Sequence, residues 1–390
     1  MASKTRALVA GGGYAGVQAA NRLRRDEQID ITLINPRSSF VERIRLHQLV
    51  TGSDDAAVDY DEVLGQGITR AVDSVTTIDA SARRVDLASG VALDYDYLIY
   101  AVGSTGSAPS VPGAADFAHS IAELEHAERL RAALMASPID APICVIGAGA
   151  TGLETAAELA EQGRRVTLLC GRVLGPSLST RGRRAVVKRM ISLGVDVIDG
   201  PDATVVEVLA DAVVLADERQ LASAVTIWTA GFGVPDLAAR SGLRTDAAGR
   251  LLTDETLTSL DDDRIVAAGD ASAPSGQPLR MSCQAAIPLG AQAAETVLSR
   301  IAGTAPKPID QAFVGQCISL GRSAGLIQLA HRDDRVMPLH AGGRAAARIK
   351  EAVCRSTVSY LTREARKPGS YRWLKGGLRE RTPAVDAVSS

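Results

Sequence analysis

The chain has 390 residues, more than one hydrophobic core usually serves, so we expect two or three domains. Its hydrophobic fraction of 46% and charged fraction of 23% are ordinary for a globular protein, and a net charge of −2 gives no support for binding nucleic acid. The five cysteines are scattered without a short-spaced pair, which excludes a cysteine-based metal site and fits a reducing compartment.

The chain opens on a strand–turn–helix–strand pattern. Apolar residues 6–10 predict a buried strand, the sequence GGGYAG at 11–16 a glycine-rich turn, residues 14–25 a helix and 29–35 a second strand. This order is a βαβ unit. The segment before the turn is too short for the apolar core of a signal peptide, and no apolar run is long enough to cross a bilayer. We therefore expect a cytoplasmic protein.

The next segments interrupt this plan. Residues 71–97 predict short antiparallel strands joined by polar turns. The sequence YLIYAVGS at 97–104 predicts a buried strand that runs into a glycine. The stretch 105–117, rich in Pro, Gly and Ser, predicts a domain boundary.

The plan of the first unit then recurs. A second glycine-rich turn, GAGATG, lies between a strand and a helix, and AVTIWTAGFG mirrors YLIYAVGS. Further on, residues 261–273 predict a strand and turn, 313–330 a hairpin, and the basic segment 344–383 a helix before a polar tail. We expect an α/β chain with two Rossmann-like domains and a smaller α+β C-terminal region. The second unit should contain a helix at 121–137, strands at 141–146 and 164–170, a helix at 153–162 and a later strand at 224–233.

Each glycine turn has the GxGxxG spacing of a dinucleotide-binding loop. The first glycine allows a tight turn, the second lets the backbone approach a pyrophosphate, and the third brings the helix against the sheet. The helix N-terminus then attracts the phosphates. The alternative is a pair of structural turns that bind no ligand. The predicted cofactor-binding residues are Gly11, Gly13, Tyr14, Ala15 and Gly16 in the first turn and Gly147, Gly149, Thr151 and Gly152 in the second.

An acid usually follows such a turn by about twenty residues and holds a ribose hydroxyl, but it is missing from both copies. The first copy has Asn35, whose amide can still bond a hydroxyl. The second has Cys170, Gly171 and Arg172, and an arginine there can pair with a 2′-phosphate. These residues favour NADPH, or the use of both NADH and NADPH, unless Arg172 is simply a solvated loop residue.

The paired turns occur together with YDYLIYAVGS, TIWTAGFG and RIVAAGDAS. Over residues 6–330 the chain therefore resembles the FAD-dependent pyridine nucleotide oxidoreductases, and especially the type II NADH dehydrogenases and apoptosis-inducing-factor-like quinone reductases. The resemblance implies a glutathione-reductase-like architecture of three-layer ββα domains, with FAD in the first cradle and NAD(P)H in the second. It implies an FAD-binding domain at 1–110 and 240–305, an NAD(P)H-binding domain at 111–239 and a C-terminal region at 306–390.

The resemblance also implies roles for single residues. Asp270 in AAGD matches the aspartate that binds the ribityl chain of FAD, and Gly103 and Gly231 match glycines where the chain passes close to cofactor. Glu154 matches a glutamate near the nicotinamide, in the first turn of its helix, and is expected to orient the nicotinamide amide. Gln284 matches one glutamine of the AQxAxQ motif beside the quinone of type II NADH dehydrogenases. Val75 and Ala101 are further positions expected to contact a cofactor.

Disulfide reductases of this superfamily carry a cysteine pair in the segment that corresponds to residues 35–52, and this chain has none there. The flavin is therefore expected to pass electrons directly to an external acceptor, which excludes the glutathione- and thioredoxin-reductase types. Arginines in the segment would neutralise FAD phosphates or reduced flavin, unless they form a solvated basic helix. The polar residues concerned are Arg37, Arg43, Arg45, His47 and Gln48.

The leading hypothesis is an FAD-dependent NAD(P)H dehydrogenase that reduces a quinone or a similar small acceptor. Within the AQxAxQ match, however, Cys283 and Pro288 replace an alanine and the second glutamine. One alternative is a reductase for a small iron–sulfur protein, and another is a flavin-containing redox sensor that binds a partner through residues 344–383. The basic helix in that segment would touch the inner face of a membrane reversibly, or would pack on the body of the protein or at a homodimer interface.

Overall fold

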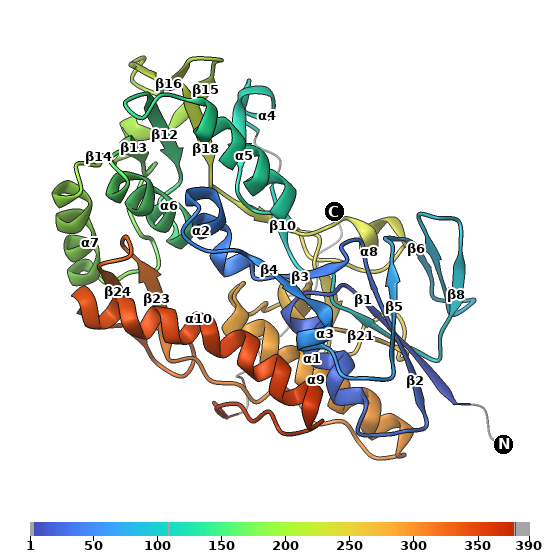
Figure 1. The fold of residues 1–390 in the computed structure, drawn as a ribbon. Helices are drawn as coiled ribbons and strands as arrows, with labels where there is room; N and C mark the ends of the chain where they lie inside the picture. Colours follow the sequence, from blue (N-terminus) through green and yellow to red (C-terminus); the bar gives the residue numbers. More distant parts are fainter. Residues whose placement is uncertain (1–3, 108–109, 378, 380–390) are drawn as a thin grey trace, which may run out of the picture.

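The computed structural model describes residues 4–107, 110–377 and 379, and it contains two five-stranded parallel sheets, each flanked by helices (Figure 1). This arrangement confirms the expected α/β fold class with two Rossmann-like units. The strands of the first sheet come from residues 5–100 and from 265–267, whereas those of the second come from 118–228. The exact limits proposed for the domains stay a prediction.

The first sheet has the order β21-β9-β1-β2-β5, and all neighbours are parallel. Helix α1 (Tyr14–Leu23) is buried along its whole length and packs against α9 (Cys283–Ile301). The two helices can approach closely because residue 290 is a glycine. A Cβ added there would lie 2.1 Å from the carbonyl oxygen of Ala15. The strands are β1 (Thr5–Ala10), β2 (Ile29–Asn35), β5 (Ile68–Val72), β9 (Tyr97–Tyr100) and β21 (Ile265–Ala267).

The second sheet repeats this plan with the order β11-β18-β12-β13-β14, again all parallel. Apolar side chains of its strands and of the helices beside it form one buried core. The helices are α5 (Leu124–Ala136), α6 (Ala150–Glu161) and α7 (Thr180–Ser192), and the strands are β11 (Ala118–Ser120), β12 (Pro142–Ile146), β13 (Arg165–Leu169), β14 (Asp196–Ile198) and β18 (Val225–Trp228).

Two three-stranded antiparallel sheets extend the units. The sheet β6-β7-β8 confirms the meander expected at 71–97, and the sheet β15-β16-β17 is its counterpart in the second unit. Their strands are β6 (Val75–Asp79), β7 (Arg84–Leu87), β8 (Ala92–Asp94), β15 (Val205–Val208), β16 (Ala212–Leu215) and β17 (Gln220–Ala222).

The C-terminal region joins the two units. The expected hairpin at 313–330 is present as β23 (Gly315–Ser319) and β24 (Gly325–Ala330), and β25 (Val336–Gly342) adds a third strand. Helix α10 (Gly343–Arg366) then runs from β24 to α1, so that it lies along both units (Figure 1). Its inner face is buried and includes Leu361, which belongs to the core around α1. The basic helix therefore packs on the body of the protein, as one of the alternatives from the sequence proposed.

Three expected helix boundaries are wrong by two or three residues. Helix α6 begins at Ala150 rather than 153, because the last residues of the glycine turn are already helical and Gly149 is the residue that precedes the helix. Glu154 consequently lies in the second turn of α6 and not in its first. Helix α1 ends at Leu23 rather than 25, and α5 begins at Leu124 rather than 121.

Within the described parts of the chain, no helix is both long enough and apolar enough to cross a membrane. Shorter elements complete the fold. They are β3 (Ser39–Val41), α2 (Leu46–Thr51), β4 (Ala57–Asp59), α3 (Tyr60–Val63), β10 (Thr105–Gly106), α4 (Ala114–Phe117), β19 (Phe232–Gly233), α8 (Leu237–Arg240), β20 (Leu251–Thr253) and β22 (Ser272–Pro274), with 3-10 turns at Arg43–Arg45, Pro201–Ala203 and Gly269–Ala271.

Candidate dinucleotide-binding site

The first glycine turn connects β1 to α1 and has no room for side chains at two of its glycines. Gly11 has a φ of +108°, and a Cβ there would lie 2.2 Å from the carbonyl oxygen of Ala101. A Cβ at Gly16 would lie 1.8 Å from the carbonyl oxygen of Gly11. Gly13 is different, because it is exposed and no described atom lies within 4 Å of its Cβ position. The turn is thus tightly packed except at the position where a ligand would approach.

The second turn, between β12 and α6, has the same geometry. Gly147 has a φ of +105°, and a Cβ there would lie 2.8 Å from Oγ1 of Thr229. A Cβ at Gly152 would again lie 1.8 Å from the carbonyl oxygen of the first glycine. Gly149 is exposed and has open space, as Gly13 has. The two halves of the chain therefore contain two equivalent cradles.

Both cradles end at a helix N-terminus suited to an anion. Gly13 precedes α1 and Gly149 precedes α6, and within the described ranges no side chain caps either helix. The first backbone amides and the positive end of the helix dipole are then left for a ligand, which is the usual environment of a bound pyrophosphate. Each cradle therefore has the free space and the donors that a dinucleotide requires.

The residues between the glycines have different surroundings. Tyr14 is buried, and its ring lies edge-on against Phe40 with centroids 5.1 Å apart. Ala15 is buried under Gly269 and Gly290, so both side chains contribute packing that fixes the turn. Thr151 is partly exposed in the first turn of α6, where its hydroxyl is near the N-terminus.

The carboxyl ends of three other strands of the first sheet bring further predicted residues to the first cradle. Asn35 ends β2, Ala101 and Gly103 follow β9, and Asp270 follows β21. Ligands of open α/β sheets bind at this edge. The Asn35 side chain also stabilises the turn, since its Oδ1 accepts a 3.0 Å hydrogen bond from the Gly12 amide. Its Nδ2 donates to the carbonyl oxygen of Arg37 over 2.9 Å.

Arg43 connects this edge to the segment after β2. Its Nη1 donates to the carbonyl oxygen and to Oγ of Ser104, over 2.9 and 2.7 Å. Ser104 in turn donates to Oδ2 of Asp270 over 2.7 Å. Burial lowers the pKa of Arg43, although the nearby carboxylate of Asp270 opposes this shift. A cation and a hydrogen-bonding carboxylate are thus held side by side, as a site for phosphate and polyol groups requires.

Other residues of the same segment are not a solvated basic helix, so that alternative is wrong. Arg45, His47 and Gln48 are buried, and Arg45 pairs with acids from three places in the chain. Arg37 is half-buried, and its Nε donates to Oε1 of Glu125 over 2.6 Å. The structure brings Arg43 to Asp270, whereas it places Arg37 against the start of α5. The three acids that pair with Arg45 are Glu42, Asp54 and Glu351.

Val75 lies away from the glycine turn. It is the first residue of β6, in the antiparallel extension of the first unit, and is partly buried against a core that includes Leu8 and Tyr100. Those contacts are apolar. Among the described residues they do not bring Val75 to the carboxyl ends of the strands around the first cradle, and they give it no polar partner. Its expected cofactor contact stays a prediction.

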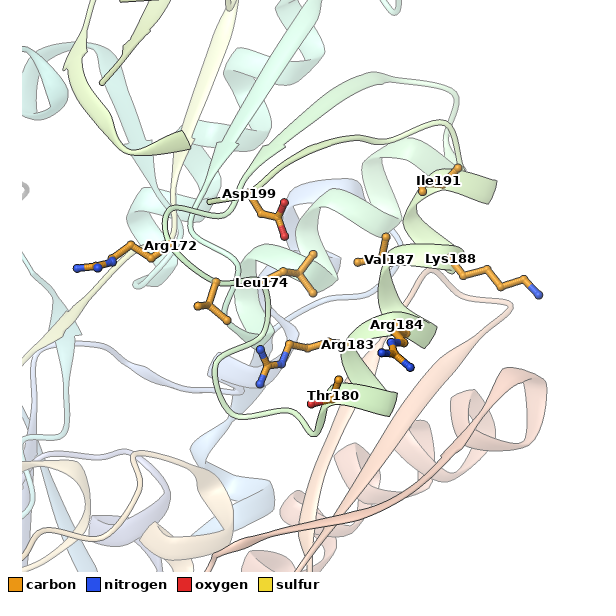
Figure 2. Close-up of a pocket in the computed structure, with 10 residues that line it drawn as sticks. Arg172, Leu174, Thr180, Arg183, Arg184, Val187, Lys188, Ile191 and Asp199 are labelled. Carbon is orange, nitrogen blue, oxygen red and sulfur yellow. The ribbon is translucent and has the colours of Figure 1, made fainter. Parts of the chain in front are cut away.

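In the second unit, Arg172 lines a cavity of about 550 Å³ between the loop after β13 and helix α7. Arg183 and Lys188 line it as well, and Asp199 is its one acidic lining residue. Figure 2 shows Arg172 and Lys188 extending on opposite sides of this group, with Arg183 between them. The excess of cations suits an anionic group. The full lining is Arg172, Val173, Leu174, Thr180, Arg183, Arg184, Val187, Lys188, Ile191 and Asp199.

Gly231 follows β18 at the corresponding edge of the second sheet. It is exposed, with a φ of +80°, and a Cβ there would lie 2.3 Å from Oγ of Ser107. A side chain at this position would therefore strain the backbone and clash with the segment that connects the two units. The close approach explains why glycine is present, whether or not a cofactor lies beside it.

Glu154 is buried against the C-terminal region. Its Oε1 lies 3.0 Å from Nζ of Lys350 on α10 and accepts a 3.0 Å hydrogen bond from the Ser319 amide. Burial alone would raise the pKa of Glu154, but the charge of Lys350, the nearby His47 and the hydrogen bonds from Ser319 and Lys350 together outweigh it, so the pKa is lowered. The pKa of Lys350 is raised by the same pairing, against the effect of its own burial. The pair is therefore a buried carboxylate and a buried ammonium.

Gln284 is the second residue of α9, close to the sheet edge that carries Asp270. Its Oε1 accepts a 3.4 Å hydrogen bond from Nη2 of Arg280. Pro288 has no amide hydrogen to donate to the Gln284 carbonyl one turn earlier, and Nε2 of Gln311 donates to that carbonyl instead, over 3.1 Å. The proline is thus accommodated inside the helix by a side chain from a distant segment.

Lys350 and Ser104 contact predicted site residues, Glu154 and Asp270, and no motif in the sequence marks either of them. The five cysteines are free, and Cys283 at the start of α9 is the one nearest to Gln284 in sequence. No disulfide relay is therefore formed in the part of the chain that the structure describes.

Several known proteins are similar to this chain. An NADH dehydrogenase-like protein of Mycobacterium tuberculosis is 29% identical over 327 residues, which cover 76% of this chain and 80% of the relative. A type II NADH:quinone oxidoreductase of Staphylococcus haemolyticus is 27% identical over 374 residues, which cover 85% and 91%. The solved structure of NDH2 from Plasmodium falciparum in complex with NADH has the same fold, with a TM-score of 0.79, 14% identity and coverage of 94% and 99%.

The sequence profile of the pyridine nucleotide-disulphide oxidoreductases matches residues 5–290. That range contains both glycine turns, the strand ends around Asp270 and the first turns of α9. The chain therefore belongs to the pyridine nucleotide-disulphide oxidoreductase family, whose members contain FAD and use NAD(P)H.

Proposed function

We propose that this protein oxidises NAD(P)H and passes the electrons through FAD to a quinone or a similar small acceptor. The observation that carries the proposal is the presence of two equivalent cradles, each with an exposed glycine at an uncapped helix N-terminus. Two dinucleotides are needed when one stays bound and the other exchanges. The Staphylococcus haemolyticus relative is named for the same reaction, with NADH as donor and a quinone as acceptor.

The residues of the first cradle fit FAD. Gly13 leaves space for the pyrophosphate, Arg43 supplies positive charge, and Asp270 supplies a carboxylate for the hydroxyls of the ribityl chain. Bound FAD would accept a hydride and release its electrons to the acceptor. The protein's own contribution is to fix both dinucleotides at their strand edges and to supply charge and protons there.

We infer that the donor is NADPH, or both NADPH and NADH. The cavity beside Arg172 lies at the end of β13, where the ribose of a nucleotide bound to the second cradle would point. Four cations and one acid line it, so that a 2′-phosphate would be attracted and not repelled. Asp199 is the one charged acceptor in this lining for a ribose hydroxyl.

The acceptor is inferred from the chemistry that the chain lacks and from its relatives. The five cysteines are free, so the residues described here hold no dithiol to carry electrons onward. Direct transfer to a small planar acceptor needs no such group. Two alternatives are tested against this proposal: an iron–sulfur protein as the acceptor, and a sensor that docks through residues 344–383. The second is less favoured, because most of that segment already forms a helix packed on both units.

We further propose reversible contact between the outer face of α10 and an anionic membrane surface. Ile349, Val353 and Tyr360 are exposed on that face, and Arg348 and Arg344 flank them. Vesicles with anionic lipid should pull down the protein at low salt and release it at high salt. A homodimer formed through the same face would instead be seen as a doubled mass in solution and no binding to vesicles.

The reaction is tested by an anaerobic titration of the purified, yellow protein. NADPH or NADH should bleach the flavin, and menadione should restore its colour. The rate of recovery should not fall as salt is added, because a small neutral acceptor needs no charged protein face. A protein that neither reductant bleaches, or that ferredoxin reoxidises and quinones do not, would contradict the proposal.

A further inference from the structure

The start of α5, in the second unit, is attached to the first unit on both sides of the first glycine turn. That turn follows β1, which lies between β9 and β2 in the sheet. On the β9 side, the hydroxyl of Thr105 donates a hydrogen bond to Oε1 of Glu123. On the β2 side, Arg37 pairs with Glu125. Residues 122–125, which we call the strap, therefore extend across the mouth of the first cradle.

Arg37 holds the strap by a two-point contact. Its Nε and Nη2 donate to the two carboxylate oxygens of Glu125 over 2.6 and 2.7 Å, and Nη2 lies 3.4 Å from Oε2 of Glu123. Parallel hydrogen bonds of this kind are stronger and more directional than single ones. The hydrogen bond from Arg37 lowers the pKa of Glu125 to about 2, so the pair is charged at neutral pH. The two side chains are 30% and 47% exposed, so the contact can open to water and is weakened by salt.

Arg43 attaches the strap nearer to the centre of the site. Its Nε donates to the carbonyl oxygen of Ala122 over 3.1 Å, while its Nη1 is bonded to Ser104, the residue that donates to Asp270. Strand β10 lies directly against the same segment, since a Cβ added at Gly106 would be 3.1 Å from Cβ of Ala122. The strap thus follows the strand edge at which the first cradle would hold its ligand.

The second cradle is held differently. Its turn follows β12, which lies between β18 and β13. On the β18 side, the short strand β19 pairs with β10. On the β13 side, Arg172 has a place similar to that of Arg37 after β2, but its side chain forms no ion pair or hydrogen bond with any residue that the structure describes (Figure 2). The ion pair that closes one side of the first cradle therefore has no counterpart at Arg172.

We propose that the strap retains FAD in the first cradle, and that FAD enters and leaves only when the strap separates from Arg37 and Thr105. The proposal rests on the proposed function, in which one dinucleotide stays bound while the other exchanges. A dinucleotide that extends from Gly13 towards Asp270 would lie between the strap and the strand ends. An obstacle on this path slows entry and exit together, whereas a direct contact with FAD changes mainly the rate of exit.

The test measures FAD exchange in the holoenzyme, with radiolabelled FAD bound and an excess of unlabelled FAD added. In the Glu123→Gln/Glu125→Gln variant we expect exchange to be at least about tenfold faster, and in Glu125→Gln alone about threefold faster. The fraction of FAD that stays bound after dilution to equilibrium should match that of the wild type. Added salt should speed exchange in the wild type, because it screens the ion pair, and should have little effect in the double variant.

Two controls make the result specific. Glu128→Gln removes an exposed carboxylate further along α5 and should exchange FAD at the wild-type rate. Release of NADP⁺, followed by stopped flow, should be unchanged in every variant, because the strap does not cross the second cradle.

Four outcomes would decide against these ideas. Wild-type exchange rates in both Glu125→Gln and the double variant would overturn the strap. A lower fraction of bound FAD at equilibrium would also overturn it, because the two glutamates would then contribute to affinity and not to an obstacle. Equally faster release of NADP⁺ would show that the units separate as a whole, which excludes a strap specific to the first cradle. A wild-type protein that binds no flavin would instead overturn the proposed function.

Discussion

Arg22 of α1 and Glu364 of α10 form a buried ion pair in which Nε of the arginine donates to Oε1 of the glutamate over 2.8 Å. The arginine side chain is 4% exposed and the glutamate side chain is fully buried. Glu364 also accepts hydrogen bonds from the amides of Gly369 and Tyr371. The contact therefore attaches the end of the C-terminal helix, and the segment after it, to the first unit.

We expect Glu364→Ala to lower the free energy of unfolding by at least about 2 kcal/mol, because it leaves the buried Arg22 guanidinium with only the partly exposed Glu295 as a carboxylate partner. Urea unfolding of the FAD-loaded protein measures the change. Asp333→Asn removes an exposed ion pair with Arg335 and should change stability by less than about 1 kcal/mol. Equal effects of the two substitutions would show that the buried pair contributes no more than a surface pair.

The glycine turns give a prediction that separates the two cofactors. Gly13 has a φ of −81° and open space, so Gly13→Ala should fold but should weaken FAD binding at least about tenfold, since the methyl group occupies the space of the pyrophosphate. Gly149→Ala should raise the KM for NAD(P)H by a similar factor and leave the FAD content unchanged. Visible absorbance after dialysis and steady-state kinetics measure the two effects.

Gly16→Ala is the matched control for that experiment. Its Cβ would lie 1.8 Å from a backbone oxygen, so the variant should lose stability and not only cofactor. Loss of FAD from the Gly149→Ala variant, with retention in Gly13→Ala, would reverse the assignment of the two cradles.

These cradles were predictable because their geometry is local. A strand, a GxGxxG turn and a helix follow one another directly in the sequence, so the glycine spacing locates the turn and its open middle glycine, although the start of α6 at Ala150 was expected three residues later. Asp270 was expected at this site because AAGD resembles a motif of the family, and it lies three residues after the end of β21. The position of the strand in the sheet then brings its carboxylate to Ser104 and Arg43.

The contacts of α10 were not predictable from the sequence. Lys350, Glu351 and Glu364 each pair with a residue of the N-terminal half, and no spacing in the sequence specifies these partners. The arginines after β2 were open to a solvated interpretation for the same reason, because the acids that pair with Arg45 lie partly on this distant helix. Tertiary packing of a long helix decides such pairs, whereas periodicity only shows that one of its faces is buried.

The cavity beside Arg172 predicts the nucleotide preference. We expect Arg172→Ala combined with Arg183→Ala to lower kcat/KM with NADPH about tenfold or more relative to NADH, because hydrogen bonds between a guanidinium and a phosphate are lost. Steady-state kinetics with both donors and one quinone measure the ratio. Arg181→Ala removes a cation from the same helix, outside the cavity lining, and should leave the ratio unchanged. An unchanged ratio in the double variant would show that Arg172 and Arg183 are solvated cations without a part in selection.

The lowered pKa of Glu351 predicts how the stability of the folded protein depends on pH. Partial burial opposes the charge of this carboxyl, but hydrogen bonds and charge from Arg45 outweigh it and lower the pKa of Glu351 to about 2. Because the folded pKa is below the unfolded value of about 4.3, the pair stabilises the protein above that pH. The stabilisation is lost progressively as pH falls from about 4.3 towards 2.

Glu351→Gln should therefore be less stable than wild type at pH 7, and the difference should shrink as pH falls, because the wild-type protein loses the same interaction when Glu351 is protonated. Urea unfolding midpoints measured across that range give the two curves. Glu128→Gln, at an exposed position on α5, should follow the wild-type curve throughout. Parallel curves for wild type and Glu351→Gln would mean that Arg45 obtains its stabilisation from Glu42 and Asp54, the other two acids that it contacts.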